Sequence, residues 1–150
     1  MKCSEFMTKT PACCLPGDTA DKAAQLMQRD DVGSVPVIDS QQTKRLIGIV
    51  TDRDLALTIV ANSRDAKSTQ VEVVMTRDLI TCREDDDLQA ALAAMGKHQV
   101  RRIPIVDGQN RLVGIIAQAD VATRAGQEKE TGEIVEQISK SRAKSSAGQH

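Results

Sequence analysis

The sequence predicts an α+β protein of two β-α-β-β-α halves, related by pseudo-two-fold symmetry and with their sheets packed together. The first observation behind this prediction is that Met7–Asp39 aligns with Met75–Asp107 without a gap. The second is that, after two extra residues in the first copy, Lys44–Ala56 aligns with Asn110–Ala122. Each copy also alternates helical and extended periodicity. Because a half of about 55 residues would be marginal alone, the two copies are expected to share one core.

Each half is expected to open with a short extended segment, at Pro11–Leu15 and at Leu79–Arg83. A helix follows, with an acidic N-cap at Asp18 in the first copy and at Asp86 in the second. Apolar residues then recur at the spacing of one helix face. They are Ala20, Ala23, Ala24 and Met27 in the first copy and Leu88, Ala91, Leu92 and Met95 in the second.

Two short apolar strands come next, SVPVI with RLIGIV in the first copy and RIPIV with RLVGII in the second. A second helix begins within the phrases GIVTDRDL (Gly48–Leu55) and GIIAQADV (Gly114–Val121). The predicted organisation is a first repeat at 6–62, a linker with some helical content at 63–74, a second repeat at 75–126, and a short amphipathic helix with a flexible tail at 127–150.

Composition excludes several classes of function. The net charge of −1 gives no electrostatic footprint for nucleic acid, and Phe6 is the only aromatic residue available to stack on a base. No stretch approaches the ~20 apolar residues of a spanning helix, and no signal peptide is visible. We therefore expect a cytoplasmic protein that binds neither nucleic acid nor membrane.

The four cysteines, Cys3, Cys13, Cys14 and Cys82, have neither CxxC nor Cys/His metal spacing. They are expected to be small buried side chains, with redox sensing as the alternative. The acidic run Glu84–Asp87 is expected to complement a helix dipole, so no metal site is predicted.

The two openings (FMTKTPACCLPGDT and VMTRDLITCREDDD), the middle strands (VGSVPVID and VRRIPIVD) and the two closing phrases identify a family. From Phe6 to Gly126 the chain resembles a tandem pair of cystathionine-beta-synthase (CBS) domains, a Bateman module, and is most similar to stand-alone bacterial pairs of the hypoxic-response type. The resemblance implies a sensor that binds an adenosine-containing ligand (AMP, ADP, ATP or S-adenosylmethionine) in clefts between the repeats. It also implies a homodimer that acts on a target protein and requires no cofactor.

The resemblance assigns residues to two unequal ligand sites. In it, the aspartate of each closing phrase accepts hydrogen bonds from the ribose hydroxyls, while the threonine and the helix start meet a phosphate. The stronger site has Thr51, Asp54, Thr81, Val100, Arg101 and Arg102, whose two arginines suit an anion. The weaker site has Cys13, Val32, Gly33, Ser34 and Asp120, and Ala117 stands in the threonine position.

Other interpretations of these residues stay open. Thr51 and Asp54 also fit a capping box, which any helix start can use, and Arg101 and Arg102 could be a solvated strand edge. No constellation meets the requirements of catalysis, so we expect no enzyme activity. The alternatives to a ligand sensor are a structural dimerisation module with vestigial clefts and a cysteine-based redox-responsive protein.

Apolar positions on the second helix of each half predict an interface with a second copy of the chain. They are Leu55, Ile59 and Val60 in the first half and Val121 and Ala125 in the second.

Overall fold

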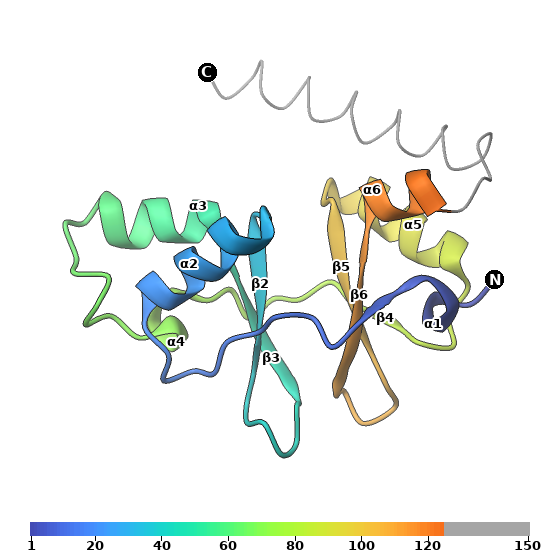
Figure 1. The fold of residues 1–150 in the computed structure, drawn as a ribbon, viewed down its shortest axis with the longest axis horizontal. Coiled ribbons are helices and arrows are strands. Elements are labelled where there is room, and N and C mark those ends of the chain that lie inside the picture. The colour runs from blue at the N-terminus through green and yellow to red at the C-terminus, as the bar shows by residue number, and fades with distance from the viewer. Residues whose placement is uncertain (125–150) are drawn as a thin grey trace. The chain divides into compact units, whose positions relative to one another are not determined.

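A computed structural model describes residues 1–124, and its helices and strands are shown in Figure 1. The chain divides into two compact units. Among the described residues, unit 1 contains Met1–Thr10, Ile80–Asp107 and 113–124, and unit 2 contains Pro11–Leu79 and Gly108–Leu112. The amphipathic helix and tail expected at 127–150 lie outside the described residues.

Unit 2 is built around a long helix and an antiparallel pair of strands rich in Val and Ile, the residue types that favour a pleated surface. The segment that follows the second strand begins as an α-helix and continues as a π-helix, which the sequence pattern did not predict. The elements of unit 2 are α2 (Ala20–Asp30), β2 (Ser34–Ile38), β3 (Leu46–Thr51), α3 (Asp52–Leu55), η1 (Ala56–Val60) and α4 (Val71–Val74).

Unit 1 repeats this plan with a matching long helix and a four-stranded sheet in the order β1-β6-β5-β4. Both long helices end at a residue with positive φ, Asp31 in unit 2 and Gln99 in unit 1. The elements of unit 1 are α1 (Cys3–Phe6), β1 (Thr8–Lys9), β4 (Cys82–Arg83), α5 (Leu88–His98), β5 (Arg102–Val106), β6 (Leu112–Ala117) and α6 (Gln118–Arg124).

The two sheets have the same strand order. In unit 1, β4 is parallel to β5 and β1 is antiparallel to β6. In unit 2, single β-bridges take the place of these outer strands. Cys14 forms a parallel bridge with Val37, and Thr76 forms an antiparallel bridge with Ile49. The predicted α+β class with two β-α-β-β-α halves is therefore confirmed. The packing of the two sheets on each other stays a prediction.

The Met-Thr dipeptide at the start of each repeat, Met7-Thr8 or Met75-Thr76, belongs to the unit that holds the other repeat. Thr8 pairs with Ile115 of β6, and Thr76 pairs with Ile49 of β3. Each opening segment thereby covers a strand edge that would otherwise present unpaired backbone groups. The compact units therefore combine residues of both repeats, and the repeat boundaries expected at 6–62 and 75–126 stay a prediction.

A contact between methionine and glycine occurs in both units and involves two positions that are identical in the two repeats. A Cβ atom at Gly48 would lie 2.5 Å from Sδ of Met75, and one at Gly114 would lie 2.5 Å from Sδ of Met7. Both distances are shorter than normal Cβ contacts, so a larger residue at either glycine would force the methionine side chain to shift. The glycine in each closing phrase therefore leaves room for the methionine at the start of the other repeat.

Buried residues form one hydrophobic cluster in each unit. The predicted face of α5 is confirmed, since all four of its apolar residues are buried. The face of α2 is confirmed at Ala20, Ala23 and Met27 but is wrong at Ala24, which is exposed. Leu26 packs against the cluster of unit 2 instead.

The predicted N-caps Asp18 and Asp86 are each wrong by one residue. The caps are Thr19 and Asp87, and the Asp87 carboxylate accepts the Gln89 N–H at 3.0 Å. Asp18 and Asp86 instead close the preceding turn, where they accept the N–H groups three residues earlier, both at 2.8 Å. A short acidic side chain can serve either purpose, so the sequence alone did not separate the two positions.

Candidate functional site

Strand β3 ends at Thr51, and helix α3 begins at the next residue. The Thr51 hydroxyl accepts the Asp54 N–H at 3.0 Å, and Oδ2 of Asp54 accepts the Thr51 N–H at 3.0 Å. The capping-box interpretation of this pair is therefore confirmed. Both side chains are half-buried, so the carboxylate stays accessible on one side.

Thr76 is a third member of this cluster that sequence analysis missed. Its hydroxyl lies 3.2 Å from each carboxylate oxygen of Asp54 and donates to them. The backbone of Thr76 is fixed by two hydrogen bonds with Ile49, at 2.8 and 2.9 Å. The Met-Thr dipeptide that opens each repeat could have drawn attention to this position, because it precedes every other shared motif.

The equivalent turn in unit 1 lacks the hydroxyl. Strand β6 ends at Ala117, and α6 carries Asp120, which is half-buried. The side-chain oxygen of Gln118 is buried and has no hydrogen-bond partner among residues 1–124. This turn therefore offers an unused acceptor where unit 2 offers a capping box.

Gly33 and Arg101, the residues just before β2 and β5, differ in charge. The Gln118 N–H donates to the Arg101 carbonyl at 2.8 Å, and the Asp52 N–H donates to the Gly33 carbonyl at 2.9 Å, so the two backbones match. A Cβ atom at Gly33 would lie 3.2 Å from a carboxylate oxygen of Asp52. In unit 2 the carboxylate of Asp52 lies beside Gly33, whereas the equivalent position of unit 1 is Arg101, which is followed by Arg102.

The other predicted residues occupy equivalent positions in the two units. Val32 and Val100 follow the helix ends, and their N–H groups donate at 3.0 Å to Met27 and Met95. Cys13 and Thr81 come just before the parallel edge of each sheet and are half-buried. Each predicted ligand set draws on residues of both units, so its assembly stays a prediction.

Thiol chemistry disfavours the redox alternative. Burial raises the pKa of Cys14 to about 11, and burial also raises the pKa values of Cys13 and Cys82. The thiolate is the reactive form of cysteine, so raised pKa values oppose oxidation at neutral pH. The expectation that the cysteines are buried is confirmed for Cys3, Cys14 and Cys82, whereas Cys13 is half-buried.

Metal and membrane chemistry gain no support from the described part of the chain. Residues 1–124 contain no group of three or more Cys, His, Asp or Glu side chains placed to hold a metal ion. Asp86 and Asp87 of the acidic run are used by a turn and a helix cap. Over the same residues, no helix has the length and apolar character needed to cross a bilayer.

Residues 3–61 and 71–125 each match the family model of the CBS domain. Among curated relatives, the CBS domain-containing protein YhcV of Bacillus subtilis is 39% identical over 135 residues, covering 90% of this chain and 93% of that protein. Hypoxic response protein 1 of Mycobacterium tuberculosis is 30% identical over 118 residues, covering 79% of this chain and 80% of that protein. The resemblance stated from the sequence is confirmed by these matches.

Two solved structures with the same fold contain adenosine ligands. CBSX2 of Arabidopsis thaliana in complex with AMP has a TM-score of 0.70 and 29% identity, covering 85% of this chain and 98% of that one. The CBS domain pair of protein MJ0100, in complex with 5'-methylthioadenosine and S-adenosylmethionine, has a TM-score of 0.71 and 26% identity, covering 86% of this chain and 98% of that one.

Proposed function

The chain belongs to the CBS domain family, with tandem repeats at residues 3–61 and 71–125, and on this premise we propose that it binds an adenosine-containing ligand as a regulatory module. The candidate ligands are AMP, ADP, ATP and S-adenosylmethionine. The protein acts by binding rather than by catalysis, and it passes its occupancy to a target protein.

The carboxylate of Asp54 is the observation that carries this proposal. A carboxylate has about four acceptor positions, and here the N–H of Thr51 and the hydroxyl of Thr76 use only part of them. The half-buried side chain is held in one place before any ligand arrives. Such an acceptor suits the two hydroxyls of a ribose, and its charge strengthens each hydrogen bond.

The stronger site is assigned Thr51, Asp54, Thr81, Val100, Arg101 and Arg102. In this assignment the two arginines hold the phosphate, which favours a nucleotide over its nucleoside.

The weaker site is assigned Cys13, Val32, Gly33, Ser34 and Asp120. The carboxylate of Asp52 near Gly33 disfavours a phosphate at this end of β2. The unused side-chain oxygen of Gln118 favours a ligand with a hydrogen-bond donor next to Asp120. The weaker site therefore suits an adenosine derivative without a phosphate.

Thr76 provides a route by which occupancy changes the protein. Its hydroxyl uses the same carboxylate that a ribose would use. A ribose that takes over Asp54 weakens the bond to Thr76 and loosens the segment that leads into the second repeat. We infer that this segment, Val71–Leu79, transmits the signal.

Self-association is part of the proposal. Leu57 is 54% exposed and Val60 is 76% exposed, and both lie on the helical segment after β3. Exposed apolar side chains of this kind mark interfaces, and a symmetric dimer is the commonest closed assembly. Ile59 and Val121, which were expected to take part, are instead buried within their own units, and Ala125 lies outside the described residues.

Calorimetric titration of the protein with AMP, ADP, ATP, S-adenosylmethionine and adenosine at physiological salt tests the proposal. We expect at least one nucleotide to bind more tightly than adenosine, because adenosine has no phosphate for the arginine pair. If none of the five ligands binds a protein that is folded by circular dichroism, the structural dimerisation module with vestigial clefts becomes the better account.

A further inference from the structure

Met7 holds the segment before β1 against unit 1. A Cβ atom at Gly114 would lie 2.5 Å from Sδ, 2.7 Å from Cγ and 2.9 Å from Cβ of Met7. The Met7 side chain therefore lies along the backbone of Gly114 over its length. It also packs against the hydrophobic cluster of unit 1, and it is the last residue before β1 to do so.

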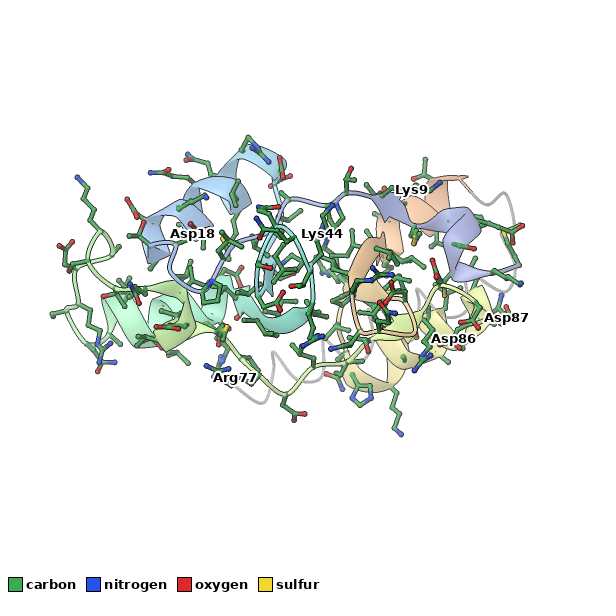
Figure 2. The ribbon with its side chains drawn as sticks, turned by 90° about the horizontal axis from the view of Figure 1, so that it is seen from below. Lys9, Asp18, Lys44, Arg77, Asp86 and Asp87 are labelled. Carbon is green, nitrogen blue, oxygen red and sulfur yellow. The ribbon has the colours of Figure 1, made fainter. Side chains whose placement is uncertain are left out.

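Strand β1 has no buried side chain of its own. It consists of Thr8 and Lys9, which are both exposed and pair with Ile115 and Gly114 of β6. Lys9 is labelled in Figure 2, on the strand that carries this pairing. A strand pair this short is only marginally stable without an apolar contact. The neighbouring methionine supplies that contact.

The equivalent segment of unit 2 has a second attachment and a better shielded methionine. The Thr76 hydroxyl donates to Asp54, whereas Thr8 makes no side-chain hydrogen bond within the described part of the chain. Met75 is 8% exposed, whereas Met7 is half-buried. Unit 1 therefore depends more on its methionine and leaves it more accessible.

Methionine differs from the cysteines in its oxidation chemistry. The raised pKa values that protect the thiols do not protect a thioether, because a thioether reacts without first losing a proton. With a peroxide, the methionine sulfur forms a bond to one oxygen and the O–O bond breaks. The proton of the transferred oxygen goes to the other oxygen, which leaves as water or as an alcohol. The sulfur is oxidised by two electrons and the peroxide is reduced by two.

We propose that Met7 is a site of reversible oxidation by peroxides and that its sulfoxide releases β1 from β6. A sulfoxide is polar, and a polar group without hydrogen bonds in an apolar contact costs free energy. The oxidised side chain therefore leaves the hydrophobic cluster and Gly114. Helix α1 stays attached, since the Cys3 N–H donates to the Asp86 carbonyl at 2.8 Å.

Peptide mass spectrometry of the full-length protein after treatment with hydrogen peroxide tests the site. Met7 should gain one oxygen at least roughly tenfold faster than Met27, Met75 and Met95, which are at most 8% exposed and must first be uncovered by a local opening. Met1 is 55% exposed and serves as the freely reacting standard. If Met7 reacts no faster than Met95, the proposal is wrong.

Hydrogen–deuterium exchange and thermal unfolding test the consequence. In the oxidised protein, residues 7–9 and 114–115 should exchange faster, and the unfolding temperature should fall by roughly 2–8 °C. The variant Met1→Leu should respond like the parent. The variant Met7→Leu should not respond, because leucine has a similar volume and no sulfur. An equal loss of stability in Met7→Leu and in the parent would place the effect at another residue.

Reversal of the modification separates methionine from cysteine and needs no variant. Methionine sulfoxide reductases A and B, supplied with dithiothreitol, should restore the exchange rates and the unfolding temperature of the oxidised parent. Dithiothreitol alone should not. Full recovery with dithiothreitol alone would assign the effect to a thiol and overturn the proposal. These measurements are made without a ligand, so their outcome is independent of the proposed nucleotide site.

Discussion

Replacing Asp54 by asparagine separates the two roles assigned to this side chain. The asparagine carbonyl oxygen can still accept the Thr51 N–H, which is now bonded at 3.0 Å. Its amide nitrogen takes the place of the second carboxylate oxygen and cannot accept the Thr76 hydroxyl, now 3.2 Å from both oxygens. The helix start therefore keeps most of its cap, while the acceptor proposed for the ribose loses its charge and one of its two oxygens.

The expected magnitudes differ enough to be measured. Loss of a complete helix cap costs about 0.5–2 kcal/mol, and Asp54→Asn should cost less than this because one bond is kept. Loss of hydrogen bonds to a charged acceptor should weaken AMP binding by about 1.5–3 kcal/mol, or roughly ten- to a hundred-fold. Urea unfolding measures the first quantity and calorimetry measures the second.

Asp120→Asn is the matched control for this experiment. It makes the same change at the equivalent position of the second repeat, where no threonine hydroxyl stands at the end of the strand. It should reduce AMP affinity less than Asp54→Asn does. If Asp54→Asn leaves AMP affinity unchanged while Asp54→Ala lowers stability, the carboxylate only caps its helix. A damaging Asp120→Asn beside a silent Asp54→Asn would reverse the assignment of the two sites.

Three further predictions concern packing, assembly and pH. Gly48→Ala should lower the free energy of unfolding by about 1–3 kcal/mol in urea, since its Cβ meets Sδ of Met75. The double variant Gly48→Ala, Met75→Ala should lose less stability than the two single variants added together. Replacing Leu57 and Val60 by serine should shift sedimentation from dimer to monomer with little change in unfolding temperature, because both side chains are exposed; an unchanged dimer would place the interface elsewhere. Burial raises the pKa of Cys14 from 9.0 to about 11, so between these pH values the unfolded thiol releases a proton that the folded thiol keeps. The contribution of Cys14 to the free energy of unfolding is then complete below about pH 9 and is lost as pH rises to about 11, and Cys14→Ala should show a smaller decline over this range.

The repeat and its periodicity were enough to predict the main elements. The sequence alignment placed β2 and β5 correctly, because an apolar run bounded by polar loops has few alternatives. Helix α5 was also predicted well, since a regular apolar face is a property of the segment itself. A local sequence pattern predicts a helix or strand correctly where the residues of that segment determine its structure.

Features set by distant segments were not predictable in this way. Thr76 contacts Asp54 across 22 positions of sequence, and no local pattern couples them. The exchange of opening segments between units depends on which strand edges need a partner, which is a property of the folded sheets. The charge carried by Asp52 beside Gly33 likewise became visible only when the turn after β3 was seen to lie against the start of β2.

The exchange of Thr8 and Thr76 between the units restricts how the chain can be cut into smaller folded pieces. A fragment ending at residue 62 would retain Thr8 without Ile115 and would lose Thr76, whose backbone covers Ile49. Each compact unit therefore contains residues from both repeats. Under the proposed function, a ligand at Asp54 that displaces the Thr76 hydroxyl would act directly on the first residues of the second repeat, because these two residues are hydrogen-bonded.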